Sequence, residues 1–459
     1  MTAAVPYRPP APNPRSPVRS LLRVVLRGER NLLSLFPDLA YRRLVSRIGL
    51  TRRGILLVND PALVQRILAD PDGIFPKSDL MVGALEELVG DSLFVSSGAT
   101  WRRQRRMVDP AFSHMRIHRA FLGMDAAVDT YCAHLDALAD GGTPFSLDAA
   151  MSHLTADIIC RTIFSTSLES QVAREVFDDF TVFERHVAHV DVARLLFSRP
   201  WAHIPQPADV AAACRRIRGH VGALLDPRLA AGAAPQDDIA GALLEARDAD
   251  TGAPFTREEL IDQVGVFFLA GHETTASALT WAFFILSQRP DVVARVRAEV
   301  AQVVGDGPVT FEHTRRLPFI RNVFRETMRL YPPITFLPRV ALRPTTIGGF
   351  RVRRGSMVMI APWAMHRHER LWRDPDRFDP DRFLPEREGE VPAGAYLPFG
   401  LGPRVCVGAA FATVEGALIL ARLVRRYDWE ALVPGAVRPA ARLTTRPERE
   451  VTCRVRRAG

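Results

Sequence analysis

Cysteine and lysine are both scarce in this sequence. Five cysteines are scattered over 459 residues, their number is odd, and no Cys-x-x-Cys pair occurs. This distribution excludes a disulfide framework and a structural zinc site, and it favours a reducing compartment. The 60 basic residues include one lysine, Lys77, so arginine carries nearly all of the positive charge. From the cysteine distribution we expect a cytosolic protein.

Long apolar runs are also missing. The opening segment MTAAVPYRPPAPNPRSP is rich in proline and has no apolar stretch, which argues against a signal peptide or a membrane anchor. We expect a flexible proline-rich segment over residues 1–20 and a single domain over residues 21–459. The net charge of +9 would suit nucleic-acid binding, but the arginines are dispersed among acidic residues and form no basic stripe. A nucleic-acid-binding protein is therefore disfavoured.

Helical periodicity dominates the middle of the chain, from about residue 120 to residue 302, with a proline-rich interruption over residues 198–207. Strand-like segments are few; they lie near Gly54, around Ile347 and in the C-terminal RPEREVTCRV. The pair Gly348–Gly349 between apolar runs predicts a hairpin turn. Strands and helices do not alternate, which disfavours a parallel sheet. The sequence predicts one large, mainly helical domain with a small β part.

The longest predicted helix covers residues 256–288 and ends before Pro290. Thr256 and Glu259 have the spacing of a capping box at its start. A helix of this length spans roughly 50 Å, enough to cross the whole molecule. The polar residues HETT interrupt its apolar run at the centre, which excludes a membrane span. We expect a core helix with a polar break in the middle.

The segment FGLGPRVCVG, residues 399–408, places a cysteine among glycines. Glycines permit tight turns and close backbone approach. A helix-like apolar run begins at Ala409, so Cys406 lies just before a helix N-terminus, where amides and the helix dipole stabilise a thiolate. Such a thiolate serves as a nucleophile or as a soft metal ligand. No histidine lies near it in the sequence to act as its base.

This segment resembles the haem-binding loop of the cytochrome P450 family, Phe-x-x-Gly-x-Arg-x-Cys-x-Gly. Every fixed position is matched, by Phe399, Gly402, Arg404, Cys406 and Gly408. The resemblance implies that Cys406 is the axial ligand of a b-type haem iron, that Phe399 packs near its sulfur and that Arg404 reaches a haem propionate. It also implies the family fold, a triangular, mainly helical body around the haem with a small sheet domain near the N-terminus.

A second segment, RNVFRETMRLYPP, matches the family independently. Glu326 and Arg329 are three residues apart and share one helix face. Alone, such a pair is usually a surface ion pair of little consequence. Here it resembles the family's Glu-x-x-Arg pair, and Arg382 in the later FDPDRF resembles the arginine that completes a buried cluster. The resemblance implies a structural role for the three residues on the thiolate side of the haem.

The polar centre of the long helix, AGHETT, resembles the family's oxygen-binding signature. The resemblance implies that Ala270 and Gly271 leave room for O₂ beside the helix. It also implies that Thr274 steadies the activated oxygen and that Glu273 relays protons from solvent. Thr274 can hydrogen-bond to a carbonyl of its own helix and so open a groove there. We expect His272 to point away from the iron.

Haem propionates need polar partners, and further residues stand at the family's positions for them. WRRQRR resembles the family's Trp-x-x-x-Arg helix, which implicates Trp101 and Arg105, and Arg339 follows the Glu-x-x-Arg helix. Arginine suits carboxylates because its planar fork binds both oxygens. The resemblance also implies an apolar substrate pocket. Its expected walls are Leu93, Phe94, Phe267, Ala270, Ile334, Phe336 and Leu337.

Together these motifs predict a haem-thiolate monooxygenase. It would use O₂, electrons and protons to hydroxylate or epoxidise an apolar molecule such as a terpenoid or a fatty acid. We expect the electrons to come from a separate ferredoxin and its reductase, because no reductase module is visible, with Arg102, Arg103 and Arg106 as candidates for the docking surface.

Two other functions stay open. One is a peroxide-dependent haem-thiolate hydroxylase, and the other is a non-enzymatic haem gas sensor. The acid–alcohol pair Glu273–Thr274 argues against both, because the peroxide-using branches of the family typically lack this pair and a gas sensor would have no use for a proton relay.

Overall fold

The computed structural model describes residues 7, 8, 10–12, 31–48, 53–187, 199–201, 206–230, 234, 236–433 and 437–459. Most of the predicted proline-rich segment 1–20 lies outside these ranges. The α-helices are α2 (Pro61–Ala69), α3 (Asp79–Val89), α4 (Gly98–Val108), α5 (His114–Gly141), α6 (Leu147–Phe164), α7 (Gln171–Val187), α9 (Ala208–Leu229), α10 (Ile239–Glu245), α11 (Arg257–Leu286), α12 (Pro290–Val303), α13 (Phe311–Arg315), α14 (Pro318–Leu330), α15 (Pro362–Met365) and α16 (Ala409–Arg426). The short 3₁₀-helices are η1 (Leu32–Leu35), η2 (Asp38–Tyr41), η3 (Asp109–Phe112), η4 (Pro380–Phe383), η5 (Pro385–Glu390) and η6 (Gly402–Arg404).

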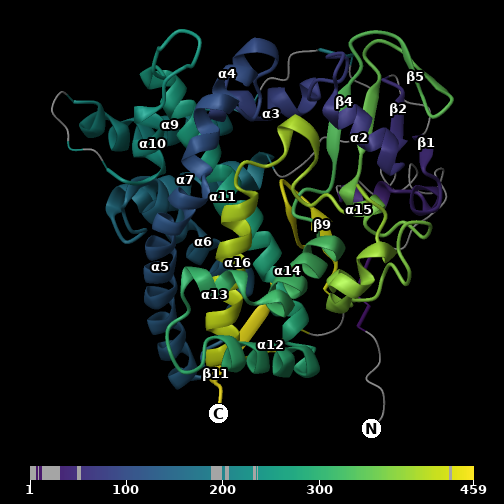
Figure 1. The fold of residues 1–459 in the computed structure, drawn as a ribbon. Helices are drawn as coiled ribbons and strands as arrows, with labels where there is room; N and C mark the ends of the chain where they lie inside the picture. The colour runs from purple at the N-terminus through teal and green to yellow at the C-terminus, as the bar shows by residue number, and fades with distance from the viewer. Residues whose placement is uncertain are drawn as a thin grey trace.

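Short strands form small sheets beside the helices. The strands are β1 (Val45–Ile48), β2 (Ile55–Val58), β3 (Phe145–Ser146), β4 (Leu337–Val340), β5 (Thr345–Ile347), β6 (Phe350–Val352), β7 (Met357–Ile360), β8 (Tyr427–Ala431), β9 (Pro439–Ala441), β10 (Thr445–Pro447) and β11 (Thr452–Arg457). In Figure 1, β1, β2, β4 and β5 stand together at the upper right, while helices fill the centre and the left. The predicted fold class, mainly helical with a small β part, is confirmed.

The largest sheet combines distant parts of the chain. Its strand order is β1-β2-β7-β4, with β2 parallel to β7 and the other neighbours antiparallel. Two strands come from near the N-terminus and two from residues 337–360, so the sheet is less N-terminal than expected. The predicted hairpin joins β5 to β6, and Gly348 and Gly349 there have φ values of +53° and +81°. Glycine adopts such left-handed conformations without steric cost.

Helix α11 is the predicted long helix, and a capping box starts it. The Thr256 hydroxyl accepts from the Glu259 amide at 3.2 Å, and the Glu259 carboxylate accepts from the Thr256 amide at 2.8 Å. Its 30 residues span about 45 Å, and most of its side chains are buried. The Trp281 ring stacks on Tyr331 at 3.8 Å. None of the described helices is long and apolar enough to cross a membrane.

A buried ion cluster joins α14 to the segment that contains η4. The Glu326 carboxylate accepts from Arg329 at 2.7 and 2.8 Å, from Arg382 at 3.2 Å and from the Asp379 amide at 2.9 Å. Glu326 and Arg329 are fully buried, and Arg382 is nearly so. The remaining Arg329 nitrogens donate to the carbonyls of His366, Pro375 and Arg377. The charges are thus fully hydrogen-bonded, which buried charges require.

Substituting Glu326 with Gln should destabilise the fold by about 3–5 kcal/mol, because it leaves two buried guanidinium groups without a counter-charge. Urea unfolding followed by circular dichroism measures the change. Arg42→Ala is the control. Arg42 and Glu369 form an exposed ion pair at 3.0 Å, so this variant should leave the urea midpoint unchanged. Equal midpoints for the Glu326→Gln variant and the wild type would contradict the anchoring role of the cluster.

Candidate active site

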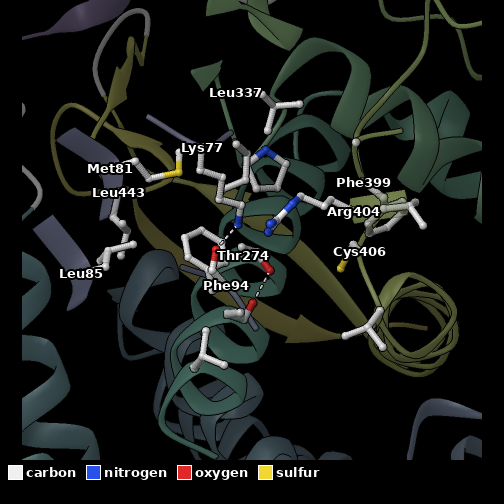
Figure 2. A pocket seen from close by; sticks show the side chains of 18 of the residues that line it. Lys77, Met81, Leu85, Phe94, Thr274, Leu337, Phe399, Arg404, Cys406 and Leu443 are labelled. Carbon is white, nitrogen blue, oxygen red and sulfur yellow. Dashed lines mark hydrogen bonds between the residues drawn. The ribbon is translucent and has the colours of Figure 1, made fainter. Parts of the chain in front are cut away.

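A cavity of about 690 Å³ lies between α11 and the loop that carries Cys406. Phe399, Cys406 and Gly408 line it from the loop, and Ala270 and Thr274 line it from α11. Figure 2 shows Cys406 on the loop ahead of α16 and Thr274 on α11, both beside this space. The volume is in the range of cavities that bind small molecules and cofactors.

Backbone contacts fix the loop around Cys406. The Cys406 amide donates to the Phe399 carbonyl at 2.9 Å, which closes the loop on itself. Gly402 has a φ of +74°, and a Cβ at this position would lie 2.7 Å from the Leu68 carbonyl oxygen. Only glycine fits there. Gly408 is the N-cap of α16, so the predicted helix does begin directly after the cysteine loop.

Desolvation by the surrounding protein acts against the free thiolate that the sequence predicts, even though the Cys406 residue is itself exposed beside the cavity. It raises the pKa of the Cys406 thiol, although the Gly408 amide, Arg105 and Lys77 favour the charged form. The N-terminus of α16 therefore does not by itself create a reactive thiolate, which disfavours a nucleophile. A coordinating metal ion deprotonates its thiol ligand outright, so the site suits a metal ligand.

Buried cations line the same cavity. Burial lowers the pKa of both Arg339 and Arg404 to about 10. Arg404 donates through Nη2 to the Ser96 carbonyl at 2.8 Å, whereas its buried Nη1 has no hydrogen-bond partner. None of the described residues that line the cavity is an aspartate or a glutamate. The residues present thus fit an iron porphyrin, whose propionates would neutralise the arginines while Cys406 binds the iron.

Trp101 and Arg105 reach the cavity from α4. The Arg404 guanidinium lies over the Trp101 ring at 4.4 Å, a cation–π contact. Arg105 donates to the Val405 carbonyl at 2.7 Å and pairs with Asp109 at 2.6 Å. Helix α4 is therefore tied directly to the loop that carries the cysteine.

Thr274 is one of two polar residues, with Thr275, that line the cavity from α11. Its hydroxyl donates to the Ala270 carbonyl at 2.6 Å, four residues earlier in the helix. The hydrogen of the hydroxyl is thereby committed, and the oxygen lone pairs remain free to accept a hydrogen bond from a group in the cavity. Such a bond to a helix carbonyl also bends the helix locally.

The structure needs a glycine at position 271 for a different reason from the one that the sequence suggests. A Cβ at this position would lie 2.3 Å from Cδ1 of Ile159, on α6. The space left by the missing side chain is therefore filled by Ile159, not held open for O₂. Gly271 permits the close packing of α6 against α11, although its backbone still lines the cavity.

Glu273 points away from this cavity. Its buried carboxylate accepts from the Thr444 hydroxyl at 2.6 Å and from Arg446 Nε at 3.1 Å, and Arg446 also binds Asp148 at 2.8 Å. Glu273 lines a second, polar cavity of about 1150 Å³ behind α11. The expected acid–alcohol pair is present, but its two members face different compartments. Its acid is paired with an arginine that no sequence motif indicated.

His272 also lies outside the cavity with Cys406, as expected from the sequence. Its Nδ1 lies 2.7 Å from the Phe268 carbonyl, and its Nε2 lies 3.0 Å from a carboxylate oxygen of Glu184 on α7. A carboxylate oxygen this close to Nε2 favours the protonated imidazole. Burial opposes this charge, but Glu184 outweighs it and the pKa of His272 is raised.

The predicted substrate residues all line the cavity with Cys406, together with Met81, Leu85 and Leu443. They are Leu93, Phe94, Phe267, Ala270, Ile334, Phe336 and Leu337. Lys77 lines it too. The sequence analysis registered that residue only as the single lysine, and no motif indicated it.

A thiol and basic side chains around one apolar cavity, whose described lining holds no carboxylate, define a haem-thiolate site. The chain belongs to the cytochrome P450 family, because the family model described as Cytochrome P450 matches residues 9–450. It is a monooxygenase that uses haem, O₂ and a redox partner and acts on an apolar small molecule.

Curated relatives and a solved structure support this assignment. The chain is 33% identical to cyclooctatin synthase of Streptomyces melanosporofaciens over 85% of its length and 84% of the relative. It is 28% identical to pentalenene oxygenase of Streptomyces avermitilis over 86% of each chain. The solved heme domain of cytochrome P450DA superposes with a TM-score of 0.79 at 25% identity, covering 90% of this chain and 89% of that one.

Gly271→Ala should destabilise the protein by about 1–3 kcal/mol through overpacking against Ile159, which outweighs the gain in helix propensity of up to about 1 kcal/mol. Adding Ile159→Val removes Cδ1 and should recover about 1 kcal/mol of this loss. Thermal unfolding of both single variants and the double variant measures the coupling. Strictly additive effects would contradict direct packing between the two residues.

The buried pair of His272 and Glu184 should make stability depend on pH. Because folding raises the pKa of His272, the stabilisation that the pair contributes is fully present below about pH 6.5, the pKa of histidine in the unfolded chain. It is lost as the pH rises through the pKa of His272 in the folded protein. The difference in unfolding free energy between the wild type and Glu184→Gln should therefore shrink with rising pH. Asp178→Asn, an exposed change on α7, is the control. A difference that stays constant with pH would contradict a protonated His272.

Proposed function

We propose that the protein inserts one oxygen atom of O₂ into a terpenoid-sized apolar molecule, with Thr274 and Glu273 managing the protons. The observation that carries this proposal is the placement of the Thr274 hydroxyl and the Cys406 thiol around one apolar cavity, with no carboxylate among its described lining residues. The names of two relatives refer to cyclooctatin and pentalenene, which are terpenoids, and this supports the substrate class.

In this proposal Cys406 binds the haem iron, and Trp101, Arg105, Arg339 and Arg404 hold the propionates. Phe399 and Gly408 shape the loop around the sulfur. Thiolate-ligated haem supplies the activation of O₂ and favours O–O cleavage. The residues of the chain do the rest: they exclude water, orient the substrate and deliver protons.

Thr274 acts as a hydrogen-bond acceptor for a protonated oxygen group in the cavity, since its own hydrogen is held by Ala270. Glu273 acts as the proton source on the opposite side of α11. To deliver a proton to the cavity, the Glu273 carboxylate has to exchange its hydrogen bond with Arg446 for one toward Thr274. Proton transfer by a positioned acid of this kind typically contributes a factor of about 10²–10⁴ to a rate.

We also propose a separate ferredoxin with its reductase as the electron source, in the cytoplasm. The net charge of +9 supports an acidic partner. Arg102 on α4 is exposed. Arg103 and Arg106 contribute less than the sequence suggests, because they pair with Glu259 and Asp250, each at 2.5 Å.

Thr274→Ala should lower the yield of oxygenated product per electron roughly tenfold or more and release the missing electrons as hydrogen peroxide. The assay combines the holoprotein, a surrogate ferredoxin and reductase, and a panel of cyclic sesquiterpene and diterpene hydrocarbons. Isotopically labelled O₂ reports incorporation by mass spectrometry.

Thr274→Ser should keep most of the coupling, because it retains the hydroxyl. Thr280→Ala is the matched control, since Thr280 lies on α11 outside the set of residues that line the cavity. Unchanged coupling in Thr274→Ala would refute the assignment of Thr274. Efficient turnover with peroxide and none with O₂ and electrons would favour the peroxide-dependent alternative.

A further inference from the structure

The largest sheet gathers arginines that look dispersed along the sequence. Residues 39–59 and 337–361, which supply its strands and the hairpin of β5 and β6, are rich in arginine and contain no aspartate or glutamate. The hairpin packs against β1, since a Cβ on Gly348 would lie 2.9 Å from Cγ2 of Val45. Both acid-free segments therefore meet on one side of the molecule, at the upper right of Figure 1. A surface of this charge attracts anionic partners.

Backbone contacts bring exposed arginines of the two segments together. Arg47 on β1 donates to the Arg351 carbonyl on β6 at 2.9 Å. Arg353 and Arg354 follow at the turn from β6 to β7, and Arg343 lies between β4 and β5. We call these arginines the basic face. All of them are exposed, and none forms an ion pair within the described part of the chain.

Two exposed apolar side chains stand beside the basic face. Trp201 is 44% exposed and Leu342 is 43% exposed. The Arg354 guanidinium lies over the Trp201 ring at 4.8 Å. The Gly355 amide donates to the Ala341 carbonyl at 2.7 Å, which brings Leu342 next to the same turn. Tryptophan and leucine flanked by arginines are typical of surfaces that contact the interface of a lipid bilayer.

A buried ion pair holds Trp201 in this position. Arg53 donates to both carboxylate oxygens of Asp79, at 2.7 and 2.9 Å, and Asp79 also accepts from the Trp201 amide at 2.5 Å. Trp201 has a φ of +59°, a left-handed conformation that is costly for a bulky side chain. The contacts of Asp79 offset this strain, and the indole ring remains outside the core.

The sheet beside the basic face is also a wall of the cavity with Cys406. Leu337 on β4 and Met359 on β7 line the cavity, and so do Gln206 and Pro207, a few residues after Trp201. Apolar molecules of the proposed substrate class concentrate in lipid, because water excludes apolar surface. A bilayer at the basic face would therefore hold such molecules close to the cavity.

We propose that the basic face, with Trp201 and Leu342, binds the surface of an anionic phospholipid bilayer, from which the apolar substrate reaches the cavity. Lipid binding goes beyond the proposed function, because it does not depend on the chemistry at Cys406. Charge alone would also suit an acidic protein, but the two exposed apolar side chains favour lipid. Asp72, on the turn whose Ile74 carbonyl accepts from the Leu342 amide at 3.0 Å, offsets part of the positive charge.

The experiment measures flotation of the holoprotein with vesicles of equal parts phosphatidylglycerol and phosphatidylcholine. The wild type should bind these vesicles, bind vesicles of phosphatidylcholine alone far more weakly, and dissociate at high salt. Arg351→Glu combined with Arg353→Glu should weaken binding roughly tenfold or more, since each arginine near an anionic surface contributes roughly fivefold. Brominated lipids should quench tryptophan emission of the wild type but not of Trp201→Phe, which keeps an aromatic anchor.

Arg316→Glu combined with Arg321→Glu is the matched control, because it changes the net charge equally at exposed positions on α13 and α14, away from the sheet (Figure 1). It should bind like the wild type. A wild type that does not float with anionic vesicles would overturn the proposal, and so would equal weakening in both double variants.

Unchanged vesicle binding in the Arg351 and Arg353 double variant, together with slower reduction by an acidic ferredoxin, would overturn it too and assign the basic face to a redox protein. Vesicle binding by a wild type that lacks a thiolate-type carbon monoxide spectrum would support the lipid surface. That same result would refute the haem site.

Discussion

The position of the cysteine loop depends on the buried carboxylate of Glu326. Glu326 fixes Arg329, and Arg329 donates to the His366 carbonyl at 2.8 Å. His366 Nε2 in turn accepts from the Leu397 amide at 3.0 Å, just before the loop begins. Burial, with Arg329 and Arg367 nearby, lowers the pKa of His366 to about 3, so the ring stays neutral and its nitrogen remains an acceptor. A chain of hydrogen bonds thus runs from one buried charge to Leu397, two residues before Phe399 and the start of the cysteine loop.

The described side chains that line the cavity include basic groups but no acidic group to balance their charge. Arg339 is buried, Arg404 and Lys77 are partly buried, and all three basic side chains line a space without carboxylates among the described lining residues. Burying charge without a counter-charge is costly. Proteins keep such an arrangement where a bound molecule supplies the missing charge. In the proposed site the propionates of the cofactor would supply this charge, and the cofactor would thereby connect the sheet, α4 and the cysteine loop.

Local patterns predicted the parts of this structure that local chemistry determines. The capping box of Thr256 and Glu259 and the start of α16 after Gly408 need only neighbouring residues, and both were found as expected. Contacts between distant segments were missed. Arg446 meets Glu273 across 173 positions, and no motif marks it. The missing side chain of Gly271 was interpreted as room for O₂, because the sequence does not reveal that Ile159 fills this space.

Helix α11 separates two compartments of opposite character. Consecutive helix residues differ by about 100° in direction, so Glu273 and Thr274 cannot face the same side. Thr274 lines the apolar cavity, whereas Glu273 lines the polar one with Arg446. In the proposed function, a proton that Glu273 supplies therefore has to cross the helix at this point. The Thr274 bond to the Ala270 carbonyl lies at this crossing, and bonds of this kind loosen a regular helix locally, which is where the proposed proton route needs it.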